Sequence, residues 1–400
     1  MQCCACKTKL LHSLQNTKDY VKCGNLRKRV LTLPRTSSIM FFECKGQSLW
    51  DVRKGLYMSF TRIREVISPE ELKDLYPLSK EAAKAKADRD AEMKRIIAGE
   101  SDKFMVIVGP CSADNEPAVL DYISRLANVQ EKVADKLFLV PRIYTNKPRT
   151  TGEGYKGIAH QPNPEKAPDM QEGLIAVRKM HLHAIEQTHL TPADEMLYPE
   201  NWPYLDDLLS YVAVGARSVE DQQHRLTISG MDVPAGMKNP TSGDFSVMLN
   251  SVTAAQHAHT FLFRQWEVET TGNPYAHTIL RGAVNKHGQS LPNYHYEDLI
   301  RLLSMYAERP HLKNPAVIVD ANHNNSNKQF AEQPRIVSEI LHSRKVNPDI
   351  AAFVKGVMIE SYIEEGCQKI GEHIYGKSIT DPCLGWNDTE QLLYEIAGRV

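Results

Sequence analysis

The sequence lacks an apolar run of about 20 residues, so we expect no segment that spans a membrane. It also lacks an excess of either charge, because 48 basic and 49 acidic residues leave a formal net charge of −1 over 400 residues. A net charge near zero argues against a broadly basic protein that binds nucleic acid. With 42% hydrophobic and 24% charged residues, the composition excludes a disordered chain, a collagen-like chain and a coiled coil.

Cysteine is scarce after residue 57, where only Cys111, Cys367 and Cys383 occur. Proteins that are held together by disulfides are usually short chains with many more cysteines for their length. The sequence therefore predicts a reduced, cytoplasmic protein.

The first 57 residues differ from the rest in charge. They hold 11 basic and 3 acidic residues, whereas the remaining 343 residues hold 37 and 46. Cys3, Cys4 and Cys6 of this leader could begin a metal site, but Cys23 and Cys44 do not supply the second closely spaced pair that zinc sites usually have. A second interpretation is an organelle transit peptide, which is basic and poor in acids. We favour a third, a disordered extension before a native start at Met58, which opens the segment MSFTRIREVI.

Residues 58–102 are predicted to form an N-terminal arm. Ser68-Pro69-Glu70-Glu71 is a capping box with proline at the first helical position, which predicts a short helix ending near Tyr76. Residues 79–98 predict a second helix, with Gly99 as its C-terminal cap. We expect this arm to pack on the main domain or on a partner subunit.

Residues 103–400 alternate short β-branched runs with longer amphipathic ones, a pattern typical of βα units and a parallel sheet. Eight such units in about 300 residues predict a TIM (β/α)8 barrel, with an open doubly wound sheet as the alternative. Thr260–Thr270 predicts an inserted β-hairpin. The predicted strands are Phe104–Val108, Leu137–Ile143, Ala193–Leu197, Val212–Ala216, Pro234–Met237, His277–Leu280, Ala316–Val319 and Gly356–Ile359.

Each predicted strand places a charged or metal-capable residue at or near its C-terminal end. In a barrel the carboxyl ends of the strands meet at one mouth, where TIM-barrel enzymes place their active sites. One such residue alone has a structural explanation, but eight at one edge favour a functional site. Six cations in this set indicate a ligand with more than one anionic group, such as two phosphates or phosphates with a carboxylate. These cations are Arg142, Lys147, Arg149, Arg217, Lys238 and Arg281, with Lys156 as a candidate seventh.

A second group at the same edge suits a divalent transition metal. Cys111, His323 and Glu360, with Asp381 as the best fourth candidate, offer a thiolate, an imidazole and two carboxylates. These residues come from distant parts of the chain, so no spacing motif supports them. The pairs His181/His183 and His257/His259 are alternatives that we interpret as structural or solvated.

Several motifs resemble those of one enzyme family, in the same order along the chain. They are GPCS at 109–112, KPRTT at 147–151, GAR at 215–217, KN at 238–239, ILRG at 279–282, the run 322–329, GVMIES at 356–361 and YGKSITDxCxGW at 375–386. From about residue 58 to 400 the sequence resembles type I 3-deoxy-D-arabino-heptulosonate 7-phosphate (DAHP) synthase. That resemblance implies a TIM barrel with an N-terminal extension, and a divalent metal such as Mn, Fe, Co or Zn. It also implies condensation of phosphoenolpyruvate with erythrose 4-phosphate at the entry to the shikimate pathway.

The resemblance assigns roles by position. Its metal ligands fall on Cys111, His323, Glu360 and Asp381. Its phosphoenolpyruvate contacts fall on Arg142, Lys147, Glu195, Arg217, Lys238 and Arg281, and its erythrose 4-phosphate contacts on Lys147, Pro148, Arg149 and Thr150. Lys147, Glu195 and His323 are the catalytic candidates. The resemblance further implies a homodimer or homotetramer with the arm at a subunit contact, and an aromatic amino acid as effector.

The sequence departs from the family pattern at several positions. Asn322 stands where serine is common, Tyr155 where tryptophan is common, and 197–202 is an unusual stretch. Asp232 occupies the position that helps feedback-inhibited relatives choose between phenylalanine and tyrosine. Two alternative functions remain. A 3-deoxy-octulosonate 8-phosphate synthase typically reads KANRS where this chain reads KPRTT, and a non-catalytic binding barrel would not need all four ligand types.

Overall fold

The structure is a computed structural model that describes residues 61–149 and 151–400. The predicted leader, 1–57, and Thr150 lie outside the described residues. Residues 66–400 form one compact unit, which holds every element described below.

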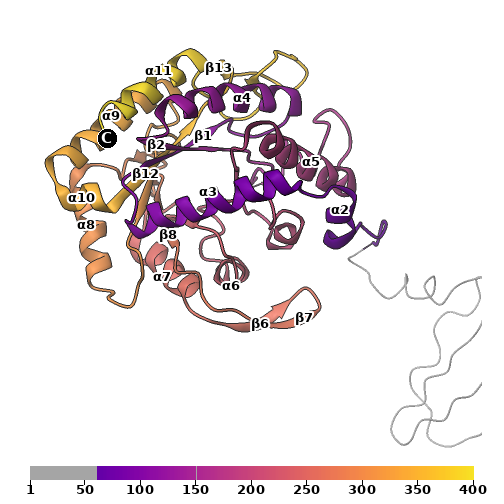
Figure 1. The fold of residues 1–400 in the computed structure, drawn as a ribbon, viewed down its shortest axis with the longest axis horizontal. Coiled ribbons are helices and arrows are strands. Elements are labelled where there is room, and N and C mark those ends of the chain that lie inside the picture. The colour runs from indigo at the N-terminus through magenta and orange to yellow at the C-terminus, as the bar shows by residue number, and fades with distance from the viewer. Residues whose placement is uncertain (1–60, 150) are drawn as a thin grey trace, which may run out of the picture. The chain divides into compact units, whose positions relative to one another are not determined.

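Eight parallel strands form one sheet in the order β2-β1-β12-β11-β8-β5-β4-β3. Of these strands, β1, β2, β8 and β12 are labelled in Figure 1. A parallel bridge between Arg142 and Ala193 joins β2 to β3 and closes the ring. The TIM-barrel prediction is therefore confirmed. The strands are β1 (Phe104–Gly109), β2 (Leu137–Pro141), β3 (Ala193–Glu195), β4 (Tyr211–Val214), β5 (Ala235–Lys238), β8 (Ala276–Leu280), β11 (Val317–Asp320) and β12 (Val354–Glu360).

Helices connect these strands on the outside of the barrel (Figure 1). After β3 the connection is a 3₁₀ helix, η1 (Pro199–Tyr204), within which Pro203 disfavours a regular α-helix. This helix covers most of the stretch at which the sequence departs from the family pattern. The other helices are α4 (Glu116–Val133), α5 (Met170–Thr188), α6 (Gln222–Ser229), α7 (Phe245–Gln256), α8 (Tyr296–Ala307), η2 (Phe330–Glu332), α9 (Gln333–Val346), α10 (Pro348–Phe353) and α11 (Trp386–Ala397).

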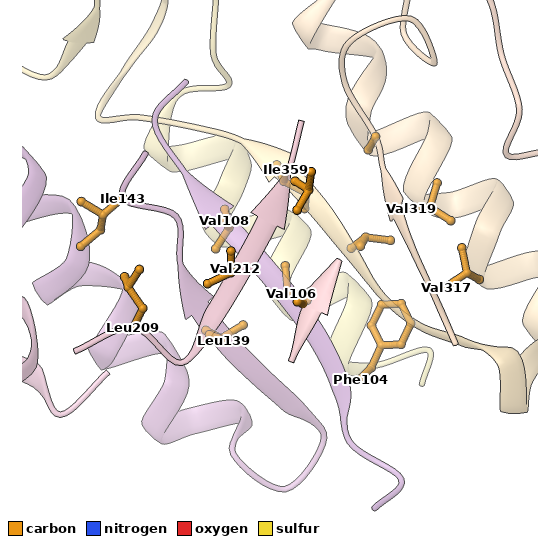
Figure 2. Close-up of a cluster of buried hydrophobic side chains, with 14 of the residues drawn as sticks. Phe104, Val106, Val108, Leu139, Ile143, Leu209, Val212, Val317, Val319 and Ile359 are labelled. Atoms are coloured by element: carbon orange, nitrogen blue, oxygen red, sulfur yellow. The ribbon is translucent and has the colours of Figure 1, made fainter. Parts of the chain in front are cut away.

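The barrel strands are buried on both faces. In β1, Phe104, Val106 and Val108 belong to the outer core between the sheet and the helices (Figure 2). Met105 and Ile107 belong to a second cluster with residues of the other strands. This alternation follows from the two-residue period of a strand, and burial of both faces explains why the strands read as continuous apolar runs.

The arm forms two helices, α2 (Pro69–Leu75) and α3 (Lys80–Ala98). The capping box at Ser68 is present, with both of its hydrogen bonds to Glu71. Gly99 ends α3 in the left-handed conformation, as expected of a glycine cap. Met93, Ile96 and Ile97 of α3 join the inner cluster of the barrel, so α3 packs on the main domain, which is one of the two expected positions.

Short two-stranded sheets complete the fold. The predicted hairpin is present as the antiparallel pair β6 (Thr260–Phe263) and β7 (Trp266–Glu269). Smaller pairs are formed by β9 (Ala283–Val284) with β10 (Ser290–Leu291), and by β13 (Glu364–Cys367) with β14 (Lys377–Ser378). In the part of the chain that the structure describes, no helix is long and apolar enough to cross a membrane.

Candidate active site

The carboxyl ends of the barrel strands bring charged side chains together at one mouth. Glu195, Lys238 and Glu360 are the last residues of β3, β5 and β12. Arg142 and Arg281 directly follow β2 and β8. Because parallel strands run in one direction, these side chains share one edge of the barrel although they lie far apart in the sequence.

Glu360 and Arg142 form a buried ion pair, with side chains that are 1% and 2% exposed. Nη2 of Arg142 donates to Oε1 of Glu360 at 2.8 Å, and Nδ2 of Asn322 donates to Oε2 at 2.6 Å. The Arg142 guanidinium also lies 3.7 Å from the ring centre of Tyr144. Separating the two charges would leave each one buried without its partner, which is strongly unfavourable. The pair therefore holds both side chains in place.

Glu195 and Lys238 form a second buried ion pair. Nζ of Lys238 donates to Oε2 of Glu195 at 3.0 Å and lies 5.3 Å from the ring centre of Tyr144. Burial raises the pKa of Glu195, but Lys238, with smaller contributions from Arg142 and His323, outweighs burial and holds that pKa below its usual value. Glu195 therefore carries a negative charge at neutral pH.

Two further side chains that can bind a metal, those of Cys111 and Asp381, converge on Glu360 of the first pair. The ligand atoms of Cys111, Glu360 and Asp381 all lie within 4.8 Å of one another. Sγ of Cys111 donates to Oδ2 of Asp381 at 3.3 Å. The ammonium of Lys147 donates to Cys111 Sγ and, at 3.0 Å, to Asp381 Oδ2. The structure thus brings together three of the four residues predicted to bind a metal.

His323, the fourth predicted ligand, borders this cluster. Its Nδ1 lies 2.8 Å from Oδ2 of Asp320, and its Nε2 lies 3.9 Å from Oε1 of Glu360. The residue adopts a left-handed backbone conformation, with φ of 49°. A carboxylate behind one ring nitrogen is a common way to orient a histidine that presents its other nitrogen to a metal.

The cluster fits a transition metal by the chemistry of its donors. Burial, with the nearby Glu360 carboxylate, raises the pKa of the Cys111 thiol to about 11. A thiol in such surroundings gives up its proton when a cation binds it, because metal ligation and deprotonation are coupled. In the structure, the Lys147 ammonium lies beside these metal-ligand atoms and supplies a positive charge there.

The remaining predicted residues lie around the mouth. Lys147, Pro148 and Arg149 are half-buried in the loop after β2, where Nε of Arg149 donates to the Tyr155 carbonyl at 2.8 Å. Arg281 is 9% exposed, and burial lowers its pKa. Arg217 is exposed.

Tyr144, Asp320 and Asn322 were not among the predicted site residues. Tyr144 could have been found from its spacing, because residues i and i+2 of an extended chain share a side and Arg142 is two residues away. The contact of Asn322 with Glu360 joins residues 38 positions apart, and no local pattern indicates it.

The fold and the site define a class: a TIM-barrel protein with a cation-rich mouth beside a thiol–carboxylate cluster. The sequence model of the DAHP synthetase I family matches residues 77–394. The chain belongs to this family.

Curated relatives share much of the chain. It is 36% identical over 340 residues to the Tyr-sensitive phospho-2-dehydro-3-deoxyheptonate aldolase of Escherichia coli K12, covering 83% of this chain and 92% of the relative. It is 36% identical over 351 residues to the Phe-sensitive enzyme of that strain, covering 84% and 95%. A solved structure of phospho-2-dehydro-3-deoxyheptonate aldolase from Francisella tularensis SCHU S4 matches with a TM-score of 0.79 and 30% identity, covering 85% of this chain and 98% of that one.

Proposed function

We propose that the protein condenses phosphoenolpyruvate with erythrose 4-phosphate to give DAHP and phosphate, the first step of the shikimate pathway to aromatic amino acids. Membership of the DAHP synthetase I family, with the convergence of Cys111, Glu360 and Asp381 beside the cationic mouth, carries this proposal. The relatives compared above bear the corresponding aldolase name.

The cations of the mouth bind the anionic groups of both substrates. The residues at the family's positions for phosphoenolpyruvate contact its phosphate and carboxylate: Arg142, Lys147, Glu195, Arg217, Lys238 and Arg281. Lys147, Pro148, Arg149 and Thr150 hold erythrose 4-phosphate, since they occupy the family's positions for that substrate. Holding two phosphorylated molecules in one orientation lowers the barrier by positioning and by stabilising charge.

Cys111, His323, Glu360 and Asp381 would hold the divalent metal. When bound, such an ion acts as a Lewis acid toward the substrate aldehyde. Asp320 orients the His323 ring, and Arg142 with Asn322 orients the Glu360 carboxylate. These contacts hold the ligand side chains in place around the ion.

The reaction forms one carbon–carbon bond and one carbon–oxygen bond, the latter from water, and breaks the carbon–oxygen bond to phosphate. Carbon 3 of phosphoenolpyruvate attacks the aldehyde carbon, water adds at carbon 2, and phosphate then leaves from carbon 2. Burial lowers the pKa of Lys147, but the combined attraction of Cys111, Asp381 and Glu360 raises it above its usual value. Lys147 therefore stays a positively charged ammonium, which can hydrogen-bond to the aldehyde oxygen and stabilise the negative charge that develops on it. Glu195 and His323 are the two candidates for activating the water.

The test is phosphate release from phosphoenolpyruvate by the full chain. We expect release with erythrose 4-phosphate, little release with arabinose 5-phosphate, and loss of release when a chelator removes the metal. Preference for arabinose 5-phosphate would favour the octulosonate alternative. No release with either sugar, at any metal tested, would favour a binding barrel and overturn the proposal.

Regulation and assembly are part of the same proposal. The relatives are named for sensitivity to tyrosine or phenylalanine, and we propose an aromatic amino acid as effector here. Asp232 is exposed and pairs with Lys94 of α3 at 2.8 Å, so its environment includes the arm. We also propose a homodimer or homotetramer with residues 58–100 at the contact. Turnover with each aromatic amino acid and the solution mass of the protein test these two points.

A further inference from the structure

The carboxylate of Asp194 lies at the join between β2 and β3 and is not among the residues that the family resemblance assigns. Its Oδ1 accepts the backbone N–H of Thr145 at 2.9 Å and that of Glu195 at 2.7 Å. Its Oδ2 accepts the Thr145 hydroxyl and lies 3.4 Å from Nε2 of His181, on α5. Asp194 is 3% exposed. One buried side chain therefore contacts two neighbouring strand ends and a helix behind them.

Thr145 begins the loop 145–157, which carries Lys147, Pro148 and Arg149. The loop returns to its own start, because the N–H of Ala159 donates to the Thr145 carbonyl at 3.2 Å. Within the loop, the N–H of Lys147 donates to the Lys156 carbonyl at 2.9 Å. Fixing Thr145 consequently fixes both ends of the loop.

Gly157 shows how tightly the loop closes. It adopts φ of +96°, and a Cβ at this position would lie 2.3 Å from the Thr145 carbonyl oxygen. Only glycine permits this close approach without a shift of backbone. Because Gly157 packs directly against Thr145, a shift of Thr145 would also move the far end of the loop.

Glu195 and Thr145 depend on Asp194 to different degrees. Glu195 pairs with Ala213 in the ladder between β3 and β4, and its carboxylate is held by Lys238. Thr145 lies beyond the end of β2. Its hydroxyl and its N–H both donate to the Asp194 carboxylate. Losing Asp194 should therefore release the loop more than it disturbs Glu195.

We propose that Asp194 is a positioning residue that fixes the loop bearing Lys147, Pro148 and Arg149 relative to Glu195, and so sets affinity for the phosphorylated aldose. The identity of that ligand rests on the proposed function, whereas the anchoring of the loop does not. Hydrogen bonds to a buried charged acceptor are among the stronger ones in proteins, which suits an anchor.

The experiment compares Asp194→Ala, Asp194→Asn and the control Asp207→Asn with the wild-type protein. Asparagine keeps an oxygen that can accept hydrogen bonds from both backbone N–H groups, so the loop 145–157 should stay anchored in Asp194→Asn. Asp207 pairs with the buried Arg178 of α5, at 2.8 Å, away from the loop. Its variant should lower thermal stability without changing substrate affinity. Thr145→Ala, which loses only the hydroxyl contact, serves as a milder variant if Asp194→Ala fails to fold.

Two readouts decide the outcome. In Asp194→Ala, hydrogen exchange of the peptide covering 143–159 should become about tenfold faster or more, since a buried charge-assisted hydrogen bond is lost. The KM for erythrose 4-phosphate should rise about tenfold and the KM for phosphoenolpyruvate by less. Asp194→Asn should stay within about threefold of wild type in both, and Thr145→Ala should fall between them.

Unchanged exchange of the 143–159 peptide in Asp194→Ala would overturn the inference. It would also be overturned if Asp194→Ala and Asp207→Asn changed stability and both KM values alike, which would mark a purely structural role. Wild-type protein without turnover would instead count against the proposed function, because the exchange measurement does not depend on activity.

Discussion

At the scale of single residues, Cys111 is the most informative side chain of the site. It is fully buried, and it contacts both Lys147 and Asp381. We predict that Cys111→Ala abolishes metal-dependent turnover while the fold persists, because the thiol is a donor in the proposed metal site and alanine fills most of its volume. Turnover and bound metal are measured together with the melting temperature.

The matched control for this variant is Cys367→Ala, at an exposed cysteine in β13. It should leave turnover and metal content unchanged. Wild-type turnover in Cys111→Ala would remove Cys111 from the site.

A second residue-scale prediction concerns acid stability. His277 is fully buried, with Nδ1 2.9 Å from the Tyr275 carbonyl and Nε2 2.8 Å from the Tyr211 hydroxyl. Burial lowers its pKa to about 4, against the smaller opposing effect of the Tyr275 carbonyl. The unfolded chain, with a pKa near 6.5, therefore binds the proton first, so stability should fall as the pH drops from about 6.5 to 4.

The expected loss from this residue is about 3 kcal/mol across that window. Urea unfolding at several pH values measures it in wild type and in His277→Gln, which cannot titrate there. As the pH falls from about 6.5 to 4, the free energy of unfolding should decline more steeply in wild type than in His277→Gln. Equal slopes would show that His277 does not titrate as its burial requires.

At the scale of elements, α3 joins the arm to the barrel. Ile96 is fully buried in the inner cluster that α3 shares with the strands. Ile96→Ala should lower the free energy of unfolding by about 3 kcal/mol, because it removes buried apolar surface and leaves a cavity. Lys84→Ala, at an exposed position of the same helix, should change it by less than about 0.5 kcal/mol. Denaturant unfolding measures both variants, and equal values would argue against a structural role for this contact.

Local signals made the elements predictable. The capping box at Ser68 and the glycine after α3 are read from neighbouring residues, and both ends form as expected. The apolar runs indicate the strands, and the charged residue after each run indicates the site. By contrast, the anchor between Asp194 and Thr145 joins residues 49 positions apart, and the carboxylate gives no sign in the sequence of which donors it will meet.

At the scale of the whole molecule, the net charge of −1 is a sum of two opposite parts. Residues 1–57 contribute +8 and the rest −9. We predict that a chain starting at Met58 keeps its turnover, because every residue assigned to the site comes after that position. It should bind an anion exchanger at neutral pH more strongly than the full chain.

The same shortened chain tests the assembly. Light scattering should give it the oligomeric state of the full chain, since the proposed contact lies in 58–100. Loss of turnover or dissociation to monomers would show that the leader contributes to folding or assembly.

The ring of strands is held unequally around its circumference. Seven neighbouring pairs share at least three paired residues each, whereas β2 and β3 meet through the bridge between Arg142 and Ala193. A closed ring that fluctuates opens first where the fewest bonds must break. The bond from Thr145 to Asp194 spans this same seam. Partial opening of the native barrel should therefore begin between β2 and β3, beside the loop 145–157. A bound substrate that holds this loop in place would also stabilise the closed barrel.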